Sequence, residues 1–417
     1  MPLSRPLLDA ATEALGLALK FDRPADAVLH DYFREQPGLG VRDRAFIADS
    51  LYGVLRRKRT VNHLASDGAR RMLLAYLVRI AGVSVRELAG AIAPAEQRWL
   101  AQIKAEPLDS LPLAVRLELP DWLAERLGRT HSETELLALA RGLNEPAPLD
   151  LRVNTLRCER EEARKRLGAD GIAAEPMPYS PVGLRVRGRP SIQRHPLFLE
   201  GALEVQDEGS QLLGYLVAPR RGELVVDFCA GAGGKSLMLG ALMRSQGRLY
   251  AFDVSASRLS RMKPRLARSG LSNLHPQPIA DEHDVRIKRL AGKADRVLVD
   301  APCSGLGTLR RNPDLKWRQS PRSLEELQRK QASILSSAAR LVKTGGRLVY
   351  ATCSFLAEEN ENIVSAFLAA QPGFRPLDCG ALLSEARISI DSDLFLKLYP
   401  HLHGTDGFFA AALIRDR

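Results

Sequence analysis

Leu224-Val225-Val226-Asp227-Phe228, followed by Cys229-Ala230-Gly231-Ala232-Gly233-Gly234-Lys235, is the stretch that decides the fold. The first five residues have the apolar, β-branched character of a buried strand, and a helix is expected from about Ser236 to Met243. Glycines let the backbone approach a ligand closely, and the start of a helix offers free N–H groups. Such a turn is typical of nucleotide binding, although alone it also fits NAD binding or tight packing.

Three further stretches of strand character follow, and each leads to an acidic residue. These are 248–252 before Asp253, 274–279 before Asp281, and 296–299 before Asp300. Strands alternating with helices predict a parallel sheet covered on both faces, whose ligands bind at the carboxyl ends of the strands. A carboxylate at the tip of the second strand is placed to hold a ribose diol, whereas Asp281 could equally be a helix N-cap.

Two cysteines also follow apolar runs of strand character. Cys303 lies in Val299-Asp300-Ala301-Pro302-Cys303-Ser304-Gly305, and Cys353 lies in Tyr350-Ala351-Thr352-Cys353-Ser354. Two thiols at strand ends beside a nucleotide loop indicate covalent chemistry. The loop lacks the spacing of a P-loop, and the chain shows no hydride-acceptor machinery. S-adenosyl-L-methionine therefore fits better than NAD, with Asp253 and Asp281 holding its adenosine.

Composition limits the class of protein. The chain has 417 residues, of which 45% are hydrophobic and 26% charged, as expected of a soluble globular protein with two or three domains. No apolar run approaches the ~20 residues of a membrane span, and the charged N-terminus is no secretory signal. Five cysteines without metal-ligand spacing fit free thiols in a reducing cytoplasm and no metal. The net charge of +11 favours a polyanionic partner such as RNA.

The first 142 residues have the apolar spacing of helices, for example over 7–19 and over 46–55. The second of these helices is expected to end in Arg56-Arg57-Lys58-Arg59. A cationic last turn suits the helix dipole, but four consecutive cations also make a plausible phosphate-binding face. Two prolines at 146 and 148 indicate a boundary. Residues 143–205 then read as a small mixed α/β linker subdomain, with strands at 149–154 and 183–186 and a helix at 160–167, before the catalytic domain over 206–417.

At these motifs the chain resembles the RsmB/Nop-type RNA cytosine-C5 methyltransferases, and within them the bacterial small-subunit ribosomal RNA branch. The resemblance rests on 227–235, 300–305 and 351–354, with supporting matches at 152–154, 206–210, 311–317 and 405–409. The family's loop usually has Ala-Ala-Pro-Gly-Gly after its cysteine, and the proline is absent here. The region around 42–46 and 56–59 is similar, more loosely, to the helical NusB-like RNA-binding domain of this branch.

The resemblance implies a Rossmann-like class I fold that uses S-adenosyl-L-methionine, preceded by an all-α NusB-like domain and a small α+β subdomain. It implies that Cys353 attacks carbon 6 of cytosine, so that carbon 5 can accept a methyl group. Cys303 is implied to assist the elimination that frees the product. Asp300 and Lys235 are implied to contact the cofactor and the base, although they could instead form a structural ion pair. The cofactor loop is implied to be Cys229, Ala230, Gly231, Ala232, Gly233, Gly234 and Lys235.

RNA contacts are expected in two places. One is the Arg56–Arg59 cluster, and the other follows the Pro-Cys loop, where cations surround Trp317. The second set is Arg310, Arg311, Lys316 and Arg318. Trp317 could equally be a core anchor. The family points to 16S ribosomal RNA as substrate and to a monomer. A transfer RNA substrate, a catalytically silent RNA-binding assembly factor and an NAD-dependent oxidoreductase are the alternatives.

Overall fold

A computed structural model describes residues 3–66, 68–188 and 190–416, and the chain divides into two compact units. The first comprises 1–146 together with 308–321, and the second comprises 147–307 together with 322–417. The segment after the Pro-Cys loop therefore belongs to the first unit, and the small subdomain shares the second unit with the large sheet. The three-domain division at 142 and 205 stays a prediction.

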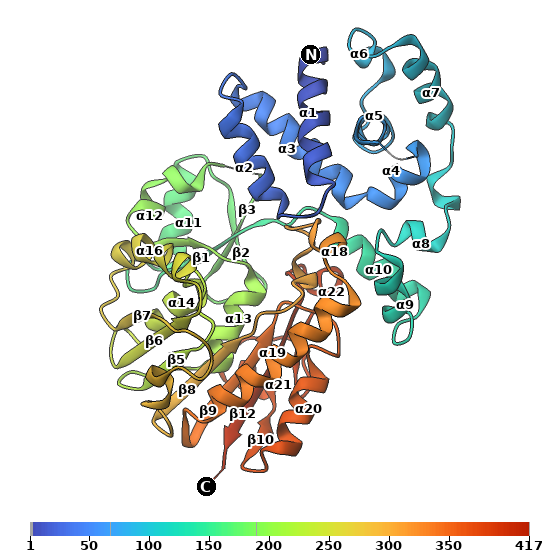
Figure 1. Ribbon diagram of the computed structural model, residues 1–417. Helices are drawn as coiled ribbons and strands as arrows, with labels where there is room; N and C mark the ends of the chain where they lie inside the picture. Colours follow the sequence, from blue (N-terminus) through green and yellow to red (C-terminus); the bar gives the residue numbers. More distant parts are fainter. Residues whose placement is uncertain (1–2, 67, 189, 417) are drawn as a thin grey trace. The chain divides into compact units, whose positions relative to one another are not determined.

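The first unit is helical, as the apolar spacing predicts (Figure 1). Its helices are α1 Arg5–Ala18, α2 Ala25–Glu35, α3 Val41–Arg56, α4 Lys58–Ala65, α5 Ala69–Arg79, α6 Val85–Leu88, α7 Pro94–Lys104, α8 Leu113–Arg116, α9 Asp121–Leu127, α10 Glu133–Asn144 and α18 Leu315–Arg318. The buried faces of α1, α3 and α5 form its core. A Cβ at Gly53 would lie 2.0 Å from Cζ of Tyr76, so only glycine allows α3 and α5 to pack this closely.

The basic run does not form the last turn of a helix, which corrects the sequence-based expectation. Helix α3 ends at Arg56, the backbone turns at Arg57, and α4 begins at Lys58. The four cations therefore project from a bend between two helices, so they do not share one helical face.

The second unit begins with a small antiparallel sheet of order β2-β3-β1-β4. Its strands are β1 Leu149–Val153, β2 Ala174–Pro176, β3 Gly183–Val186 and β4 Leu203–Val205, accompanied by α11 Arg160–Ala169 and α12 Pro196–Leu199. The strands expected at 149–154 and 183–186 and the helix expected at 160–167 are thus confirmed to within a residue or two.

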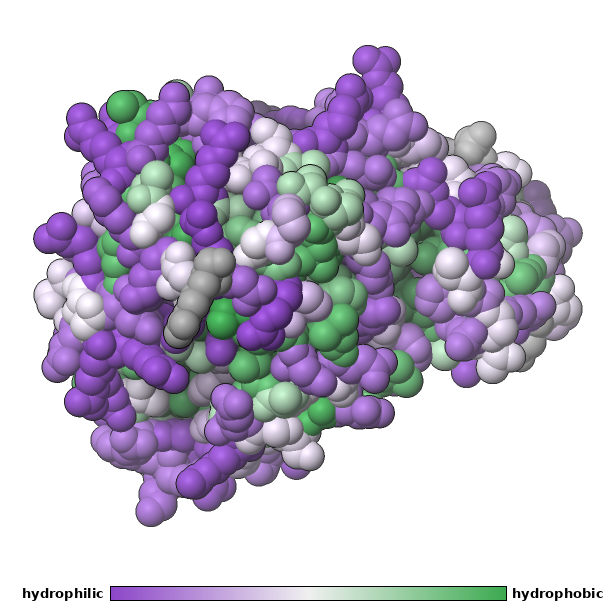
Figure 2. Space-filling model, turned by 90° about the horizontal axis from the view of Figure 1, so that it is seen from below, coloured by the Kyte–Doolittle hydropathy of each residue, from purple (hydrophilic) through white to green (hydrophobic). Residues whose placement is uncertain are grey.

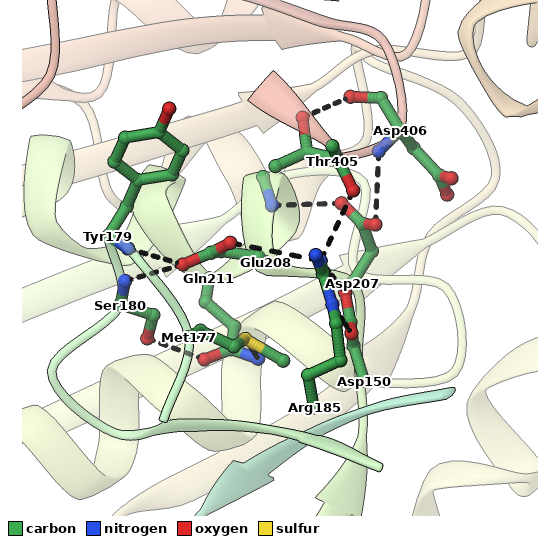
Figure 3. Close-up of polar contacts among 12 residues, drawn as sticks. Asp150, Met177, Tyr179, Ser180, Arg185, Asp207, Glu208, Gln211, Thr405 and Asp406 are labelled. Atoms are coloured by element: carbon green, nitrogen blue, oxygen red, sulfur yellow. Dashed lines mark hydrogen bonds and ion pairs between the residues drawn. The ribbon is translucent and has the colours of Figure 1, made fainter. Parts of the chain in front are cut away.

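A buried polar cluster fastens this small sheet to the large one. Figure 3 shows the Arg185 side chain of β3 among carboxylates from three segments. Its guanidinium donates hydrogen bonds to both carboxylate oxygens of Asp150, at 2.8 and 3.0 Å, and to the carbonyl of Gly404 at 3.1 Å. Glu208, at the start of α13, accepts the backbone N–H groups of Tyr179 and Ser180. The cluster therefore holds the start of α13 and the 404–406 turn against β1 and β3.

The large sheet has the order β10-β12-β9-β8-β5-β6-β7, with β11 paired to β12. Its strands are β5 Leu224–Asp227, β6 Arg248–Asp253, β7 Leu274–Pro278, β8 Ala294–Asp300, β9 Val342–Thr352, β10 Phe374–Leu377, β11 Leu396–Leu398 and β12 Phe408–Arg415. Strands β5 to β9 are parallel, whereas β12 runs antiparallel to β9, β10 and β11. This confirms the predicted parallel sheet and adds an antiparallel edge.

Successive residues of a strand point to opposite faces of the sheet. Both faces of the large sheet carry apolar side chains, and helices cover both. Val225 packs into a core with α13 Glu208–Val217, α14 Gly234–Leu242, α16 Met262–Ser269 and α21 Cys379–Glu385. Its neighbour Val226 packs into the opposite core with α17 Val285–Lys288, α19 Pro321–Ala339 and α20 Glu361–Ala370. The remaining helices are α15 Ala256–Ser260 and α22 Pro400–His403.

Hydrophilic side chains cover most of the face seen in Figure 2, with hydrophobic ones scattered between them. Within the described parts of the chain, none of the helices combines the length and apolar character that crossing a membrane requires.

Candidate active site

A hollow of about 320 Å³ lies at the carboxyl ends of the five parallel strands. Its walls come from residues at or just after each strand: Cys229, Asp253, Ile279, Asp300, Cys303 and Cys353. The chain runs from β5 outward to β7 and then returns to β8 on the other side of β5. Ligands of open α/β sheets bind at such a switch point, so the topology and the hollow indicate the same place.

The two thiols predicted from the sequence meet in this hollow. Strands β8 and β9 are parallel neighbours, with Asp300 opposite Ala351, and a cysteine follows each strand end. The Sγ atoms of Cys303 and Cys353 are 3.2 Å apart, and both thiols are free and half-buried. This distance is a hydrogen-bonding contact and not a disulfide bond, which is about 2.05 Å long.

The contact with Cys353 and burial both act on the acidity of Cys303. Hydrogen bonding to Cys353 is the largest cause that raises the pKa of Cys303 well above its usual value, followed by burial. The pKa of Cys229 is also raised, in this case mainly by burial, and a thiol that stays protonated is a poor nucleophile. Cys229 therefore suits a wall of the cofactor loop.

A buried carboxylate that sequence reasoning missed supports the thiol pair. Glu359 is fully buried, and its Oε1 accepts the N–H of Ser304 at 2.8 Å and the side-chain N–H of Gln331 at 2.9 Å. Its Oε2 accepts the Ser304 hydroxyl at 2.5 Å. Gln331 also donates to the carbonyl of Pro302, the residue before Cys303. Glu359 thus fixes the loop on both sides of that cysteine.

The loop that bears Cys353 is held by Asn360, the residue that follows Glu359 in the chain. The side-chain amide of Asn360 donates to the carbonyl of Ser354 at 3.0 Å, and its oxygen accepts the Thr352 hydroxyl at 2.5 Å. The residues on both sides of Cys353 are therefore tied to one amide. No spacing rule links 359 and 360 to either cysteine, so neither residue could be found from a sequence pattern alone.

Lys235 and Asp300 form an ion pair in which Nζ lies 2.7 Å from Oδ2. Burial by itself would lower the pKa of Lys235, but the charge of Asp300 and its hydrogen bond outweigh this and raise the pKa. The ammonium also lies 5.5 Å from the centre of the Phe408 ring. The sequence allowed either a structural ion pair or contacts with ligands. The pair exists, and Asp300 also lines the hollow.

The glycine loop is held open by its own backbone conformation and by neighbouring side chains. Gly231 and Gly233 have φ of +56° and +84°, a region that favours glycine. The N–H of Gly231 donates to Oδ2 of Asp253 at 2.8 Å. Arg152, from the small sheet, donates to the carbonyl of Gly234 at 2.7 Å. Burial lowers the pKa of Arg152 to about 10.

The acidic residues at the strand ends do not share one environment. Asp253 is buried and lines the hollow, as expected for a residue that would hold a ribose. Asp281 is exposed, its Oδ1 accepts the N–H of His283 at 2.7 Å, and it is not among the residues that line the hollow. The role of Asp281 in holding the adenosine therefore stays a prediction, and its neighbour Glu282 lines the hollow. Asp227, which the sequence left without a role, is fully buried, and burial raises its pKa to about 7.

The cations expected to contact RNA lie in the first unit, and two of them are buried. Lys316 is 1% exposed, and its ammonium donates to the carbonyl of Arg56 at 3.1 Å and to the side chain of Asn144 at 3.0 Å. Arg310 is 7% exposed. Neither presents its charge to a phosphate, so both predictions are corrected to structural roles. Trp317, which donates to the carbonyl of Leu55, is also an anchor.

The other cations are half-buried around the α3–α4 bend and α18. Arg59 pairs with Asp121 at 2.7 Å, and Lys58 lies 4.8 Å from the centre of the Trp317 ring. Arg318 lies 3.4 Å from Asp314. Arg56 donates to the carbonyl of Arg310. Arg57 lines a second hollow, and Arg311 is half-buried. Many of these cations thus already have partners within the first unit.

The sheet order, the glycine loop and the hollow define a Rossmann-like methyltransferase. The family model for the 16S rRNA methyltransferase RsmB/F matches residues 214–414, and the model for an RsmF/B-like ferredoxin-like domain matches 119–193. A probable ribosomal RNA small subunit methyltransferase B from Synechocystis is 31% identical, over 94% of this chain and 95% of its own.

Two solved structures agree with this assignment. The crystal structure of PH0851 is 26% identical with a TM-score of 0.80, and all of both chains is covered. A methyltransferase homologue from Pyrococcus horikoshii is 29% identical with a TM-score of 0.63, over 75% of this chain and all of its own. The chain belongs to the RsmB/F family of 16S rRNA methyltransferases, and it is an RNA methyltransferase. The resemblance drawn from the motifs is confirmed.

Proposed function

We propose that this enzyme transfers a methyl group from S-adenosyl-L-methionine to carbon 5 of a cytosine in 16S ribosomal RNA, through a covalent bond between Cys353 and carbon 6. The observation that carries the proposal is the contact between two thiols in the hollow, 3.2 Å apart, beside the Lys235–Asp300 pair. A methyltransferase that acted directly on a nucleophilic atom would need neither thiol.

The residues of the hollow fit S-adenosyl-L-methionine. Phe228, Val254 and Ile279 give an apolar wall suited to the adenine ring. The Asp253 carboxylate lines the hollow and can accept hydrogen bonds from a ribose. The glycines of the loop have positive φ and no side chain, so a ligand can approach the loop backbone closely. When bound, the cofactor supplies an electrophilic methyl group. The cavity of about 320 Å³ is of the size that small-molecule sites have.

Cys353 makes carbon 5 reactive. Its sulfur adds to carbon 6 of the cytosine, which turns carbon 5 into an enamine-like centre able to accept a methyl group. Carbon 5 then loses its proton, and the bond between sulfur and carbon 6 breaks to restore the aromatic ring. N3 of neutral cytosine carries no proton, so the proton that N3 gains when sulfur adds would come from the Lys235 ammonium, which Asp300 holds, and would return to Lys235 when the bond to sulfur breaks.

Cys303 is suited to the elimination step because it lies beside Cys353. Its hydrogen bond to Cys353 is the largest cause that raises its pKa. Once Cys353 is bonded to carbon 6, its sulfur is a thioether without charge, and this cause weakens. Burial and the charge of Glu359 still raise the pKa of Cys303 at that stage, so the proposed role of Cys303 as base for the carbon 5 proton rests on its position beside Cys353. The target base must leave its stack to reach both thiols, so a flipped or single-stranded cytosine is expected.

Two substitutions test these roles. Cys353→Ala should abolish methyl transfer but leave binding of the cofactor intact, which isothermal titration would show. Cys303→Ala should instead accumulate a protein–RNA adduct, seen as a slow band on a denaturing gel. Full activity in Cys353→Ala would refute the proposal, and a trapped adduct in that variant would exchange the two roles. Bisulfite sequencing of RNA from a deletion strain would identify the cytosine.

A further inference from the structure

A second hollow lies within the first unit, and four arginines line it. Its volume is about 380 Å³. Arg57 lies at the α3–α4 bend, Arg79 and Arg116 are the last residues of α5 and α8, and Arg141 lies in the last turn of α10. The ends of four helices thus bring their cations to one place, although the arginines are far apart in the sequence.

Each arginine alone is explained by the helix on which it lies. A helix C-terminus carries roughly half a negative charge, which favours a cation in its last turn. Four such ends would offset about half of the four guanidinium charges, so a positive excess remains. The buried carboxylate Glu118 accepts the N–H of Arg59 at 2.8 Å, and the charges of Lys316 and of Arg57 both act on it, so it is close to only one of the four arginines that line the hollow. The dipoles therefore explain the position of each arginine, but not the convergence of four.

The four side chains differ in how they are held. Arg79 donates to the carbonyls of Lys104, at 2.8 Å, and Glu106, so it forms a fixed part of the wall. Among the described residues, the structure gives no hydrogen bond or ion pair to the guanidinium groups of Arg116 and Arg141. Each carries five N–H donors in a fork that matches phosphate oxygens. The guanidinium of Arg57 has no hydrogen bond or ion pair among the described residues either, but its charge interacts with that of Glu118, so Arg116 and Arg141 are the two groups most available to an anion.

The rest of the wall is apolar and comes from Ile80, Leu108, Leu111 and Leu137. A hollow of this size exceeds what one acidic side chain would fill, and its combination of apolar surface with guanidinium groups suits a base next to a phosphate. An acidic protein segment would use the cations but leave the leucines uncovered. The surface is therefore matched to a nucleotide.

We propose that this hollow binds one unstacked nucleotide of the RNA substrate, with its phosphate at Arg116 and Arg141 and its base against the apolar wall. The proposal rests on the proposed function for the identity of the polymer, and it adds a binding site on the helical unit that is separate from the thiol hollow. The Arg56–Arg59 cluster contributes only Arg57 to it.

The double variant Arg116→Gln/Arg141→Gln tests the site in the full-length protein. The matched control is Arg86→Gln/Arg98→Gln, which removes the same charge from two exposed arginines of α6 and α7 that do not line the hollow. Binding of a fluorescein-labelled oligouridylate is followed by anisotropy at several salt concentrations. The hollow variant should bind about tenfold more weakly, and the slope of log K against log salt should become shallower by about 1 to 2. The control should match the wild type.

Three binding results would each overturn the proposal: unchanged affinity in Arg116→Gln/Arg141→Gln, an equal loss in the control, or polyglutamate competing with RNA for the wild type but not for that variant. Photocrosslinking with 4-thiouridine RNA should also attach label to peptides that contain Leu108–Arg116 or Leu137–Arg141, and label confined to other peptides would contradict it. Methyl transfer separates the two proposals. Arg116→Gln/Arg141→Gln should raise KM for RNA and leave kcat unchanged. Cys353→Ala should abolish kcat without affecting oligouridylate binding, and full activity in Cys353→Ala would refute the thiol mechanism but not the nucleotide site.

Discussion

Replacing Glu359 with alanine should loosen the loop that carries Cys303. The carboxylate joins two segments: Ser304 donates to it through both its N–H, at 2.8 Å, and its hydroxyl, at 2.5 Å, and Gln331 donates at 2.9 Å. All of these groups are buried, so water cannot readily replace the lost acceptor. The substitution therefore leaves donors without partners beside the thiol pair.

The magnitude follows from counting those donors. After truncation the Ser304 hydroxyl still has Ser354 Oγ, 3.3 Å away, as a partner. The Ser304 N–H and one N–H of Gln331 lose the Glu359 acceptor, and the loss of an acceptor for a buried donor costs about 1–3 kcal/mol. Glu359→Ala should therefore destabilise the enzyme by about 2–6 kcal/mol. A shift of the Cys303 loop by 1 Å should lower kcat about 100-fold.

Glu359→Gln is the informative comparison because it keeps the shape of the side chain. Its amide oxygen can still accept the N–H groups of Ser304 and Gln331, and its NH₂ group can donate to the Ser304 hydroxyl oxygen. This variant should lose only about 1 kcal/mol. Urea unfolding followed by circular dichroism gives the free energies, and methyl transfer at saturating cofactor gives kcat. Glu385→Ala, an exposed carboxylate on α21, should stay within about 0.5 kcal/mol of the wild type.

Two outcomes would refute this account of Glu359. The first is a Glu359→Ala variant as stable as the Glu385→Ala control, which would mean that the three hydrogen bonds contribute no net stability. The second is a Gln variant that loses as much stability as the Ala variant, because the contribution would then come from the negative charge and not from the acceptor positions.

Three further predictions concern the loop, a buried acid and a buried lysine. Gly233→Ala should lower the stability by about 1–3 kcal/mol, because φ is +84° and the new Cβ would lie 2.4 Å from Cγ of Met262, whereas Gly234→Ala, with no atom nearer than 3.8 Å, should unfold at the wild-type temperature or slightly above. Folded Asp227 keeps its proton up to a pKa of about 7, while the unfolded chain loses it near 4, so this group lowers the stability as pH rises from about 4 to 7. Asp227→Asn should make urea unfolding less pH-dependent than the wild type over that range, by about 4 kcal/mol in all, and parallel curves would contradict the buried carboxyl. Lys316→Ala should cost about 2–4 kcal/mol by leaving its two acceptors unpaired, but the salt dependence of oligouridylate binding should not change, and a shallower slope would return Lys316 to the RNA contacts.

The strands and the glycine loop could be predicted because each has a local signature. Residues 224–228 read as a buried strand, and the observed β5 spans Leu224–Asp227. The expected strands ending at Asp253 and Asp300 are β6 and β8. The helix after the loop begins at Gly234, two residues earlier than expected, because the N–H groups of the glycine turn already enter the first helical turn.

Burial could not be predicted for charged residues, because it depends on what tertiary packing places beside them. Lys316 and Arg318 look equivalent in the sequence, yet Lys316 is buried and Arg318 is half-buried. The segment 308–321 reads as a continuation of the catalytic domain, but its packing partners are helices more than 150 residues earlier, such as α3 and α10. Glu359 was missed for the same reason, since its partners at 304 and 331 belong to two other segments.

Adjacent parallel strands explain how two cysteines 50 positions apart in the sequence come into contact, as the proposed chemistry requires. Parallel neighbours lie about 4.8 Å apart, and both strands end at the same edge of the sheet. Asp300 is opposite Ala351, so Cys303 and Cys353 lie three and two residues beyond a shared level. Two side chains in these positions reach one point only if the longer loop folds back, and the hydrogen bonds of Glu359 and Gln331 hold it there. In the proposed mechanism, a thiol pair that makes and then breaks one bond to a single base would therefore depend on the register of β8 and β9 and on a carboxylate that is hydrogen-bonded to neither sulfur.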